Sequence, residues 1–180
     1  MRVISGFAGG RKLISPKGED TRPTSDKVRE AVFNILGNKV QDAVVLDLFA
    51  GSGAMGIEAL SRNAKTAVFV DINHTALLAV KKNLENTGLL QSSVVKNGNS
   101  LSFLKKTEIL YDIIFIDPPY NSGLYEPSLK IISEKGLLSR GGLVVLESSN
   151  VIPHDAMHGF KTITDRKYGS TFIAVLEEDN

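Results

Sequence analysis

Short apolar runs alternate with amphipathic stretches along most of the chain. Five core strands are predicted at the apolar runs 44–48, 66–70, 93–96, 112–116 and 143–146. Apolar positions at helical spacing predict helices between them, at 54–62, 73–88, 100–107 and 125–135. Regular alternation of strands and helices is typical of a parallel sheet with right-handed crossovers and helices on both faces.

The two ends of the chain add further elements. Segments 2–5 and 11–15 predict a small hairpin, and a helix is expected from Asp26 to Gly37. Segments 160–165 and 171–176 form a closing pair without a helix between them, so at least one of them must run antiparallel. The expected fold is therefore α/β: a mostly parallel seven-stranded sheet with an antiparallel strand near the C-terminus.

Length and composition favour one ordinary globular domain over residues 1–180. We expect residues 1–39 to form a hairpin-and-helix extension and residues 40–180 the core. Hydrophobic residues make up 42% and charged residues 23% of the chain, and no apolar run approaches the ~20 residues of a membrane helix. The N-terminus lacks the apolar core of a signal peptide, so a cytoplasmic location without membrane contact is expected.

Cysteine is absent, which excludes a disulfide, a thiolate zinc site and a thiol nucleophile. His154 and His158 have i,i+4 spacing, but no third ligand accompanies them, so no metal site is predicted. We expect a monomer.

The net charge of +1 hides an asymmetry. Residues 1–39 hold eight Lys and Arg against four Asp and Glu, a net charge of +4, so the remainder carries −3. A basic segment on a near-neutral body indicates a polyanion contact, although a solvated surface would have the same composition.

The tetrapeptide Asp117-Pro118-Pro119-Tyr120 follows the apolar run 113–116. The carboxyl end of such a strand is where an open α/β sheet places its ligand site. The prolines stiffen the loop and leave carbonyl oxygens, Asp117 adds a carboxylate acceptor, and Tyr120 adds a ring face. These groups suit a planar partner with N–H donors, such as a nucleobase amine. A tight Pro-Pro turn without function is the simpler reading.

A glycine-rich loop follows the first core strand and opens a helix. Gly51, Gly53 and Gly56 match G-x-G-x-x-G, and Asp71 ends the next strand 20 residues after Gly51. This is the layout of a dinucleotide-binding fold, in which the glycines allow close approach of the backbone and the acid holds ribose hydroxyls. A tight strand-to-helix turn is the alternative.

The position of Asp47 bears on which nucleotide binds. Phe49-Ala50 separates the strand from the first glycine, and Asp47 lies four residues before Gly51. An acid there would repel a pyrophosphate, which dinucleotide sites hold at the helix N-terminus. It would suit S-adenosylmethionine, which carries an ammonium, a sulfonium and a ribose. Asn99, in the loop after the third strand, is a candidate acceptor for the adenine amine, although Asn97-Gly98 could also form a simple turn.

Together the 47–53 loop, Asp71 and the 117–120 motif resemble a class I, Rossmann-like S-adenosylmethionine-dependent methyltransferase of the amino-methylating type. The N-terminal segments 1–6, 10–13 and 22–36 narrow this resemblance to the RsmD family. It implies methylation of the N2 amine of one guanine in 16S ribosomal RNA (rRNA). The family's substrate could be free rRNA or an assembling small subunit, and we lean towards the subunit. Asn99 departs from the Asp common at that loop in the wider superfamily.

The site residues follow from the motifs and the resemblance together. Expected catalytic residues are Asp117, Pro118, Pro119 and Tyr120. Expected donor-binding residues are Asp47, Phe49, Gly51, Ser52, Gly53, Asp71, Ile72 and Asn99. Expected substrate-binding residues are Arg11, Lys12, Arg22, Thr24 and Arg29, since Arg pairs with phosphate or stacks on bases. Salt bridges within the protein are the alternative for these arginines.

The expected chemistry needs no strong base. Asp117 and the Pro118 carbonyl would accept the amine hydrogens and aim the nitrogen lone pair, while Tyr120 stacks on the base. Three rivals stay open: a DNA or RNA adenine-N6 methyltransferase with the same motif, a dinucleotide oxidoreductase, and a non-catalytic RNA chaperone. The absence of a Tyr-x-x-x-Lys pair and of a substrate domain counts against the oxidoreductase.

Overall fold

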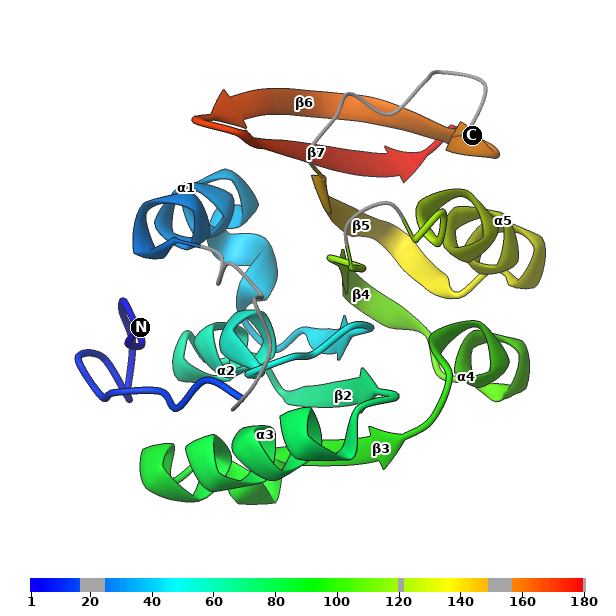
Figure 1. The fold of residues 1–180 in the computed structure, drawn as a ribbon. Helices are drawn as coiled ribbons and strands as arrows, with labels where there is room; N and C mark the ends of the chain where they lie inside the picture. Colours follow the sequence, from blue (N-terminus) through cyan, green and yellow to red (C-terminus); the bar gives the residue numbers. More distant parts are fainter. Residues whose placement is uncertain (17–24, 120–121, 149–156, 180) are drawn as a thin grey trace.

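The computed structural model describes residues 1–16, 25–119, 122–148 and 157–179. Its centre is one seven-stranded sheet in the order β3-β2-β1-β4-β5-β7-β6 (Figure 1). The strands are β1 (Val44–Asp47), β2 (Thr66–Asp71), β3 (Ser93–Asn97), β4 (Tyr111–Ile116), β5 (Leu138–Ser148), β6 (Phe160–Tyr168) and β7 (Thr171–Glu178). Among the described strands, β7 alone runs opposite to the other six. The predicted mostly parallel sheet with a reversed strand near the carboxyl end is confirmed.

Helices cover both faces of the sheet, so side chains of alternating direction along each strand feed two separate cores (Figure 1). The helices are α1 (Asp26–Leu36), α2 (Ala54–Ser61), α3 (His74–Thr87), α4 (Ser100–Lys106) and α5 (Tyr125–Lys135), with short 3-10 turns η1 (Gly37–Val40) and η2 (Leu90–Ser92). Helices α1, α2 and α3 pack on the face that buries Val45, Phe115 and Val145. Helices α4 and α5 pack on the face that buries Leu46 and Leu146.

Helix boundaries follow local chemistry. The side chains of Ser25, Asn73 and Asn99 accept hydrogen bonds from backbone N–H groups in the first turns of α1, α3 and α4. Gly88 and Gly136 end α3 and α5 with left-handed backbone angles that glycine adopts without strain. These caps explain why the predicted helices agree with the observed ones to within about two residues, the usual uncertainty of a boundary.

The strand order reverses between β1 and β4. Chain segments leave β1 towards β2 and β3 on one side, and leave β4 towards β5 on the other. The carboxyl ends of β1 and β4 therefore mark the topological switch point of the sheet. Sheets of this kind bind their ligands at that point.

Two predicted elements differ from the observed ones. Strand β5 begins at Leu138 rather than at residue 143, because Leu138 pairs with Tyr111 across a register shift near Gly141-Gly142. The N-terminal hairpin contains one β-bridge, Arg2 to Lys12, and no regular strand.

The reason lies in α2, which takes the hydrogen bonds that a second strand would need. The Glu58 carboxylate accepts from the N–H groups of Ile4 and Ser5, at 2.7 and 3.1 Å, and Ser61 accepts from Phe7 and Ala8. A Cβ at Gly6 would lie 1.8 Å from the Ser61 carbonyl oxygen, so only glycine fits there. The N-terminal segment is thus docked on α2 and shares its core.

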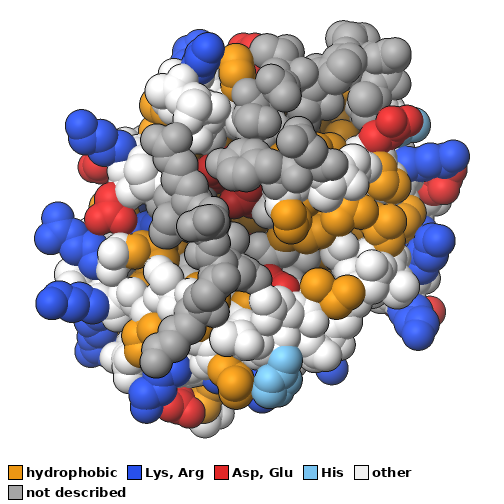
Figure 2. Space-filling view, viewed as in Figure 1, with side chains coloured by type: hydrophobic (Ala, Val, Ile, Leu, Met, Phe, Trp, Pro, Cys, Tyr) orange, Lys and Arg blue, Asp and Glu red, His pale blue; other side chains and the backbone are white. Residues whose placement is uncertain are grey.

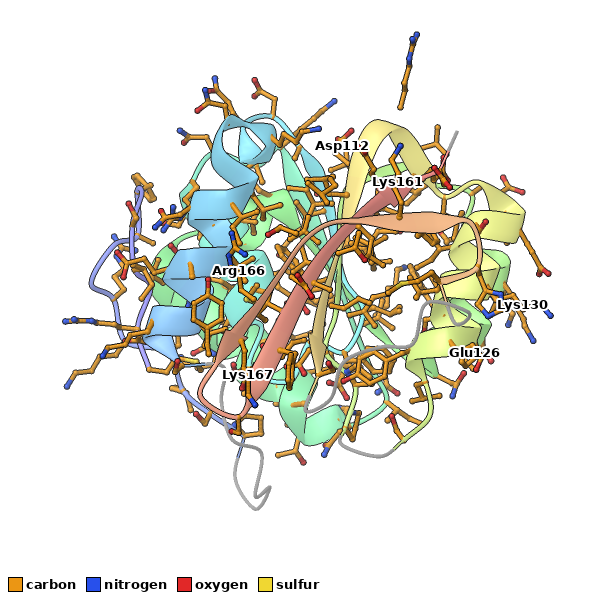
Figure 3. All side chains as sticks on the ribbon, turned by 90° about the horizontal axis from the view of Figure 1, so that it is seen from above. Asp112, Glu126, Lys130, Lys161, Arg166 and Lys167 are labelled. Carbon is orange, nitrogen blue, oxygen red and sulfur yellow. The ribbon has the colours of Figure 1, made fainter. Side chains whose placement is uncertain are left out.

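Strand β6 forms one of the two edges of the sheet, and β3 forms the other. Lys161, Arg166 and Lys167 lie along β6 (Figure 3). Lys161 pairs with Glu177 and Asp179 at 3.6 Å each, and the Lys167 ammonium lies 4.9 Å from the ring centroid of Phe172. Charged side chains of this kind discourage another strand from pairing with an open edge.

Candidate active site

Three carboxylates lie on three adjacent strands at the carboxyl edge of the sheet. Asp47 ends β1, Asp117 follows β4, and Glu147 lies near the end of β5. Ile116 pairs with Leu146, so Asp117 and Glu147 stand at the same level, while Asp47 pairs with Phe115, two residues before Asp117. Because strand side chains alternate, all three carboxylates belong to the face covered by α1, α2 and α3.

Burial and nearby negative charges raise the pKa values of Asp47 and Asp117. Burial raises the pKa of Asp47 to about 7, the Gly56 N–H opposes the rise, and the charge of Asp71 adds to it. Burial also raises the pKa of Asp117 well above its usual range, and the charges of Glu147 and Asp47 raise it further. Asp117 keeps access to solvent although protein surrounds it on most sides. Carboxyls with raised pKa values at such an edge are typical of a functional site.

The glycine-rich loop connects β1 to α2 with two left-handed residues, Gly51 and Gly53. A Cβ at Gly53 would lie 3.2–3.3 Å from Val80, Ile57 and Phe69. At Gly56 a Cβ would lie 2.3 Å from the Phe69 ring, which explains the third glycine of the motif as a site of close helix-to-strand packing.

Three backbone N–H groups in and after the glycine-rich loop, which a phosphate would need as donors, already donate to carboxylates or to a carbonyl. Gly51 N–H donates to Asp71 at 2.8 Å, Gly56 N–H donates to Asp47 at 3.0 Å, and Gly53 N–H donates to the Ala50 carbonyl at 2.6 Å. A pyrophosphate would have to displace acids already bound there and would meet their negative charge. This arrangement argues against the dinucleotide reading and fits a cationic ligand.

The second strand places Asp71 beside the loop. Its other carboxylate oxygen accepts from Asn73 N–H at 2.8 Å, which fixes the side chain while each oxygen keeps a further lone pair. Ile72, next to it, is 71% exposed and offers an apolar surface where a flat ring could lie. Phe49 is only partly buried against the opposite core.

Asn99 caps helix α4 through its side-chain oxygen, which accepts from Ser102 N–H at 3.0 Å. The same oxygen was the predicted acceptor for an adenine amine. One lone pair of this oxygen is therefore engaged in capping, and a second one is available to a ligand.

Asn83 ties the glycine-rich loop to the N-terminal segment. This fully buried side chain in α3 donates to the carbonyls of Ser52 and Ile14, at 2.9 Å each, and accepts from Ile14 N–H at 2.7 Å. The loop and the segment that precedes residues 17–24 therefore share one anchor.

The N-terminal segment presents an exposed basic and aromatic surface. Arg11 and Lys12 are exposed, which a contact with a polyanion would require. The Arg11 guanidinium lies 5.7 Å from the centroid of the Phe7 ring, which is 71% exposed, and also donates to the Asn86 carbonyl at 3.2 Å. Figure 2 shows Lys and Arg side chains along the flank that carries this segment, and acidic side chains nearer the middle of the same view.

Arg29 corrects one prediction. It was expected to contact RNA, but its side chain is fully buried and paired with Asp26 at 3.0 Å and Glu58 at 3.6 Å. It also donates to the Arg2 carbonyl. A guanidinium enclosed in this way cannot reach RNA, so Arg29 holds the fold together. Its helical spacing with Val32, Phe33 and Leu36 on the apolar face was a signal for burial.

Sequence reasoning missed two further residues. Glu147 directly follows the apolar run 143–146, and Phe7 stands alone between small residues. Tyr120, Arg22, Thr24 and His154 lie outside the described residues. In the predicted motif, Pro118 is buried and Pro119 is exposed, and the Pro119 carbonyl accepts from Ser122 N–H at 3.1 Å.

In the part of the chain that the structure describes, no helix is both long and apolar enough to span a membrane. Within the same ranges, no group of three or more His, Asp or Glu side chains is arranged to hold a metal ion.

A sheet of this order with one reversed strand, a glycine-rich loop after β1 and acids at the switch point define a Rossmann-like class I methyltransferase fold. A solved structure described as putative methyltransferase yhhF from Escherichia coli has the same fold, with a TM-score of 0.86 and 34% sequence identity. The match covers 99% of this chain and 98% of that one.

The family model "Conserved hypothetical protein 95" matches residues 1–177, so the chain belongs to this family. The predicted RsmD resemblance is confirmed by relatives across most of the chain. The ribosomal RNA small subunit methyltransferase D of Escherichia coli strain K12 is 40% identical over 148 residues, 82% of this chain and 74% of the relative. The putative rRNA methyltransferase YlbH of Bacillus subtilis is 37% identical over 182 residues, 99% of each chain.

Proposed function

We propose that the protein transfers a methyl group from S-adenosylmethionine to the exocyclic N2 amine of a guanine in small-subunit rRNA. The observation that carries this proposal is the row Asp47, Asp117 and Glu147 at the switch point of the sheet. A row of acceptors beside a nucleotide-type loop suits a cationic donor and an amine acceptor together. The names of the relatives supply the rRNA class of the substrate.

The residues around the glycine-rich loop fit the donor. Asp47 would face its positive charge, Asp71 its ribose hydroxyls, and Ile72 and Asn99 its adenine, with Phe49, Gly51, Ser52 and Gly53 shaping the loop. S-adenosylmethionine supplies a methyl group already activated on a sulfonium. The protein is therefore left with binding, orientation and exclusion of water.

Asp117 orients the acceptor. The amine of a purine is a weak nucleophile because its lone pair is delocalised into the ring. A carboxylate that accepts an amine hydrogen favours the geometry in which this lone pair points away from the ring plane. The Pro118 carbonyl and the Tyr120 ring complete the proposed base site, together with Pro119 as a stiff spacer.

The N-terminal surface serves as the RNA contact. Arg11 and Lys12 are exposed cations for phosphates, with Arg22 and Thr24 proposed nearer the reacting base. Phe7 adds a face on which an unpaired base can stack, and its loop is held rigidly by Ser61. We extend the proposal to a monomer acting on 16S rRNA within an assembling subunit, in the cytoplasm.

The test is transfer of labelled methyl from S-adenosylmethionine to four acceptors: naked 16S rRNA, undermethylated small subunits, 23S rRNA and duplex DNA. The expected product is N2-methylguanosine in the small-subunit samples. Label recovered as N6-methyladenosine or in DNA would retain the donor and overturn the target. Donor binding without label in any acceptor would overturn the proposed activity on these substrates.

A further inference from the structure

Glu147 lies beside the proposed acceptor residue on the adjacent strand. Its predecessor Leu146 pairs with Ile116, the predecessor of Asp117, so the two acidic residues occupy one level of the sheet. Both belong to the face that buries Phe115 and Val145. The charge of Glu147 accordingly helps to raise the pKa of Asp117, after burial.

The backbone of Glu147 is held on both sides. Its pairing with Ile173 of β7 continues the antiparallel ladder, and its carbonyl accepts from the Tyr125 hydroxyl at 2.5 Å. Glu147 itself is buried. A group fixed in this way is better suited to reading a ligand than a side chain on a loose loop.

Two adjacent carboxylates match one edge of guanine. On its Watson–Crick edge, guanine presents the N1–H donor next to the N2 amine donor. Adenine presents its amine next to an N1 acceptor. If Asp117 takes the amine, a carboxylate beside it gains a hydrogen bond from guanine and meets a lone pair in adenine. A site built to bond an N–H group rejects the analogue that lacks it by about 10⁴–10⁵-fold.

We propose that Glu147 is the residue that selects guanine, by accepting the N1–H of the base whose amine Asp117 orients. This inference rests on the proposed function. It goes further by assigning base selection to a residue outside the Asp117–Tyr120 motif, which guanine and adenine enzymes share.

The test uses 2-aminopurine, which keeps the 2-amino group of guanine but has an N1 acceptor in place of N1–H. The reactive nucleotide is first mapped with wild-type protein on undermethylated small subunits. Small-subunit rRNA carrying guanine or 2-aminopurine at that position is then prepared by ligation and reconstituted. Initial rates of label transfer are compared for wild-type protein, Glu147→Gln and the matched control Glu108→Gln. Glu108 is exposed and lies before the amino end of β4, at the opposite edge of the sheet.

Wild-type protein and the control should prefer guanine by at least about 100-fold, a conservative fraction of the discrimination such sites reach. In Glu147→Gln the rate on guanine should fall and the rate on 2-aminopurine should rise, since the new amide can donate to the N1 acceptor. The preference should then shrink to less than about 10-fold, which is within reach of one exchanged hydrogen bond.

Equal rates of wild-type protein on both bases would overturn the inference. It would also be overturned if Glu147→Gln preferred guanine over 2-aminopurine as strongly as wild-type protein does. If that variant does not fold, Glu147→Asp withdraws the carboxylate without changing its chemistry. It should slow transfer to guanine, and an unchanged rate would overturn the inference. Absence of N2-methylguanosine with wild-type protein would instead mean that the proposed function has failed.

Discussion

The guanidinium of Arg29 lies 3.6 Å from the carboxylate of Glu58, and both side chains are fully buried. Glu58 also accepts from Arg62 at 2.8 Å and from the backbone N–H groups of Ile4 and Ser5. One carboxylate thus joins α1, α2 and the N-terminal segment. A buried ion pair adds little net stability over an apolar pair, but removal of one partner leaves a charge without compensation.

Glu58→Ala should therefore lower the free energy of unfolding by about 3–5 kcal/mol. Urea unfolding followed by circular dichroism measures this change. Glu85→Ala, which removes the exposed partner of Lys82, is the control and should cost less than about 1 kcal/mol. A loss below about 1 kcal/mol for Glu58→Ala would show that the network does not anchor the segment.

Asp117→Ala should reduce kcat at least about 100-fold, because the amine loses the acceptor that orients it. Affinity for S-adenosylmethionine should stay within about twofold, since Asp117 is assigned to the acceptor and not to the donor. Single-turnover transfer and calorimetric titration measure the two effects separately. Turnover near the wild-type rate would remove Asp117 from the proposed mechanism.

Asp47 should oppose stability and support donor binding. Its folded pKa, about 7, lies above its ordinary 3.8, so the folded protein binds more protons than the unfolded chain between these values. Stability is lost as the pH rises through this window. Asp47→Asn should thus raise the free energy of unfolding at pH 8 by about 2 kcal/mol, about half of the full value of such a shift, with less gain near pH 4.

The same substitution should weaken the binding of S-adenosylmethionine. In the wild-type protein the affinity should fall below about pH 7 as Asp47 gains a proton, and this pH dependence should vanish in Asp47→Asn. Thermal unfolding and calorimetric titration across pH 5 to 8.5 record both effects. The assignment would be contradicted if the gain in the free energy of unfolding of Asp47→Asn over wild type were smaller at pH 8 than at pH 4.

The acid limb of the rate profile should report on Asp117 and its acidic neighbours. Burial and the charges of Glu147 and Asp47 raise its pKa, and the ionised form is the better acceptor. Activity should be present above this raised pKa and lost as the pH falls through it. Glu147→Gln removes one of the charges and should move the limb to lower pH. If the acid limb does not move in single-turnover pH profiles, the charge of Glu147 does not affect the pKa of Asp117.

Arg11 and Phe7 should affect RNA binding differently. Arg11→Ala should weaken binding and reduce the slope of log K against log salt by about 1, as expected for one lost phosphate contact. Phe7→Ala should weaken binding by about 1–3 kcal/mol without changing that slope, because stacking releases no counterions. Filter binding across a salt series distinguishes the two. Identical slopes for Arg11→Ala and wild type would count against a phosphate contact.

Much of the fold followed from local chemistry. Asn73 and Gly88 bound α3 as predicted, since a side-chain cap and a left-handed glycine are encoded within a few residues of the helix. Asp71 and Asp117 were placed correctly at strand ends, because an apolar run shows where a buried strand stops, and the strand of Asp47 ends one residue earlier than predicted. Their roles in binding and catalysis stay predictions.

The remaining features depend on pairing between distant segments. Glu147 becomes a neighbour of Asp117 only through the register of β4 and β5. Two short N-terminal strands were expected, but Glu58 and Ser61 of α2 take their hydrogen bonds. Arg29 was counted as surface charge because net charge carries no information about burial. Each miss arises where tertiary contacts override a local pattern.

Strand β7 lies between two strands that precede it in the chain, β5 and β6. During synthesis, β5 and β6 leave the ribosome first, and in the described structure β6 is joined to the sheet only through β7. Until β7 has been synthesised, the edge of β5 and the strand β6 both lack the strand with which they pair in the folded protein. This part of the sheet can therefore be completed only after β7 has emerged, and charged side chains such as those of Arg166 and Lys167 discourage other strands from pairing with β6 before then.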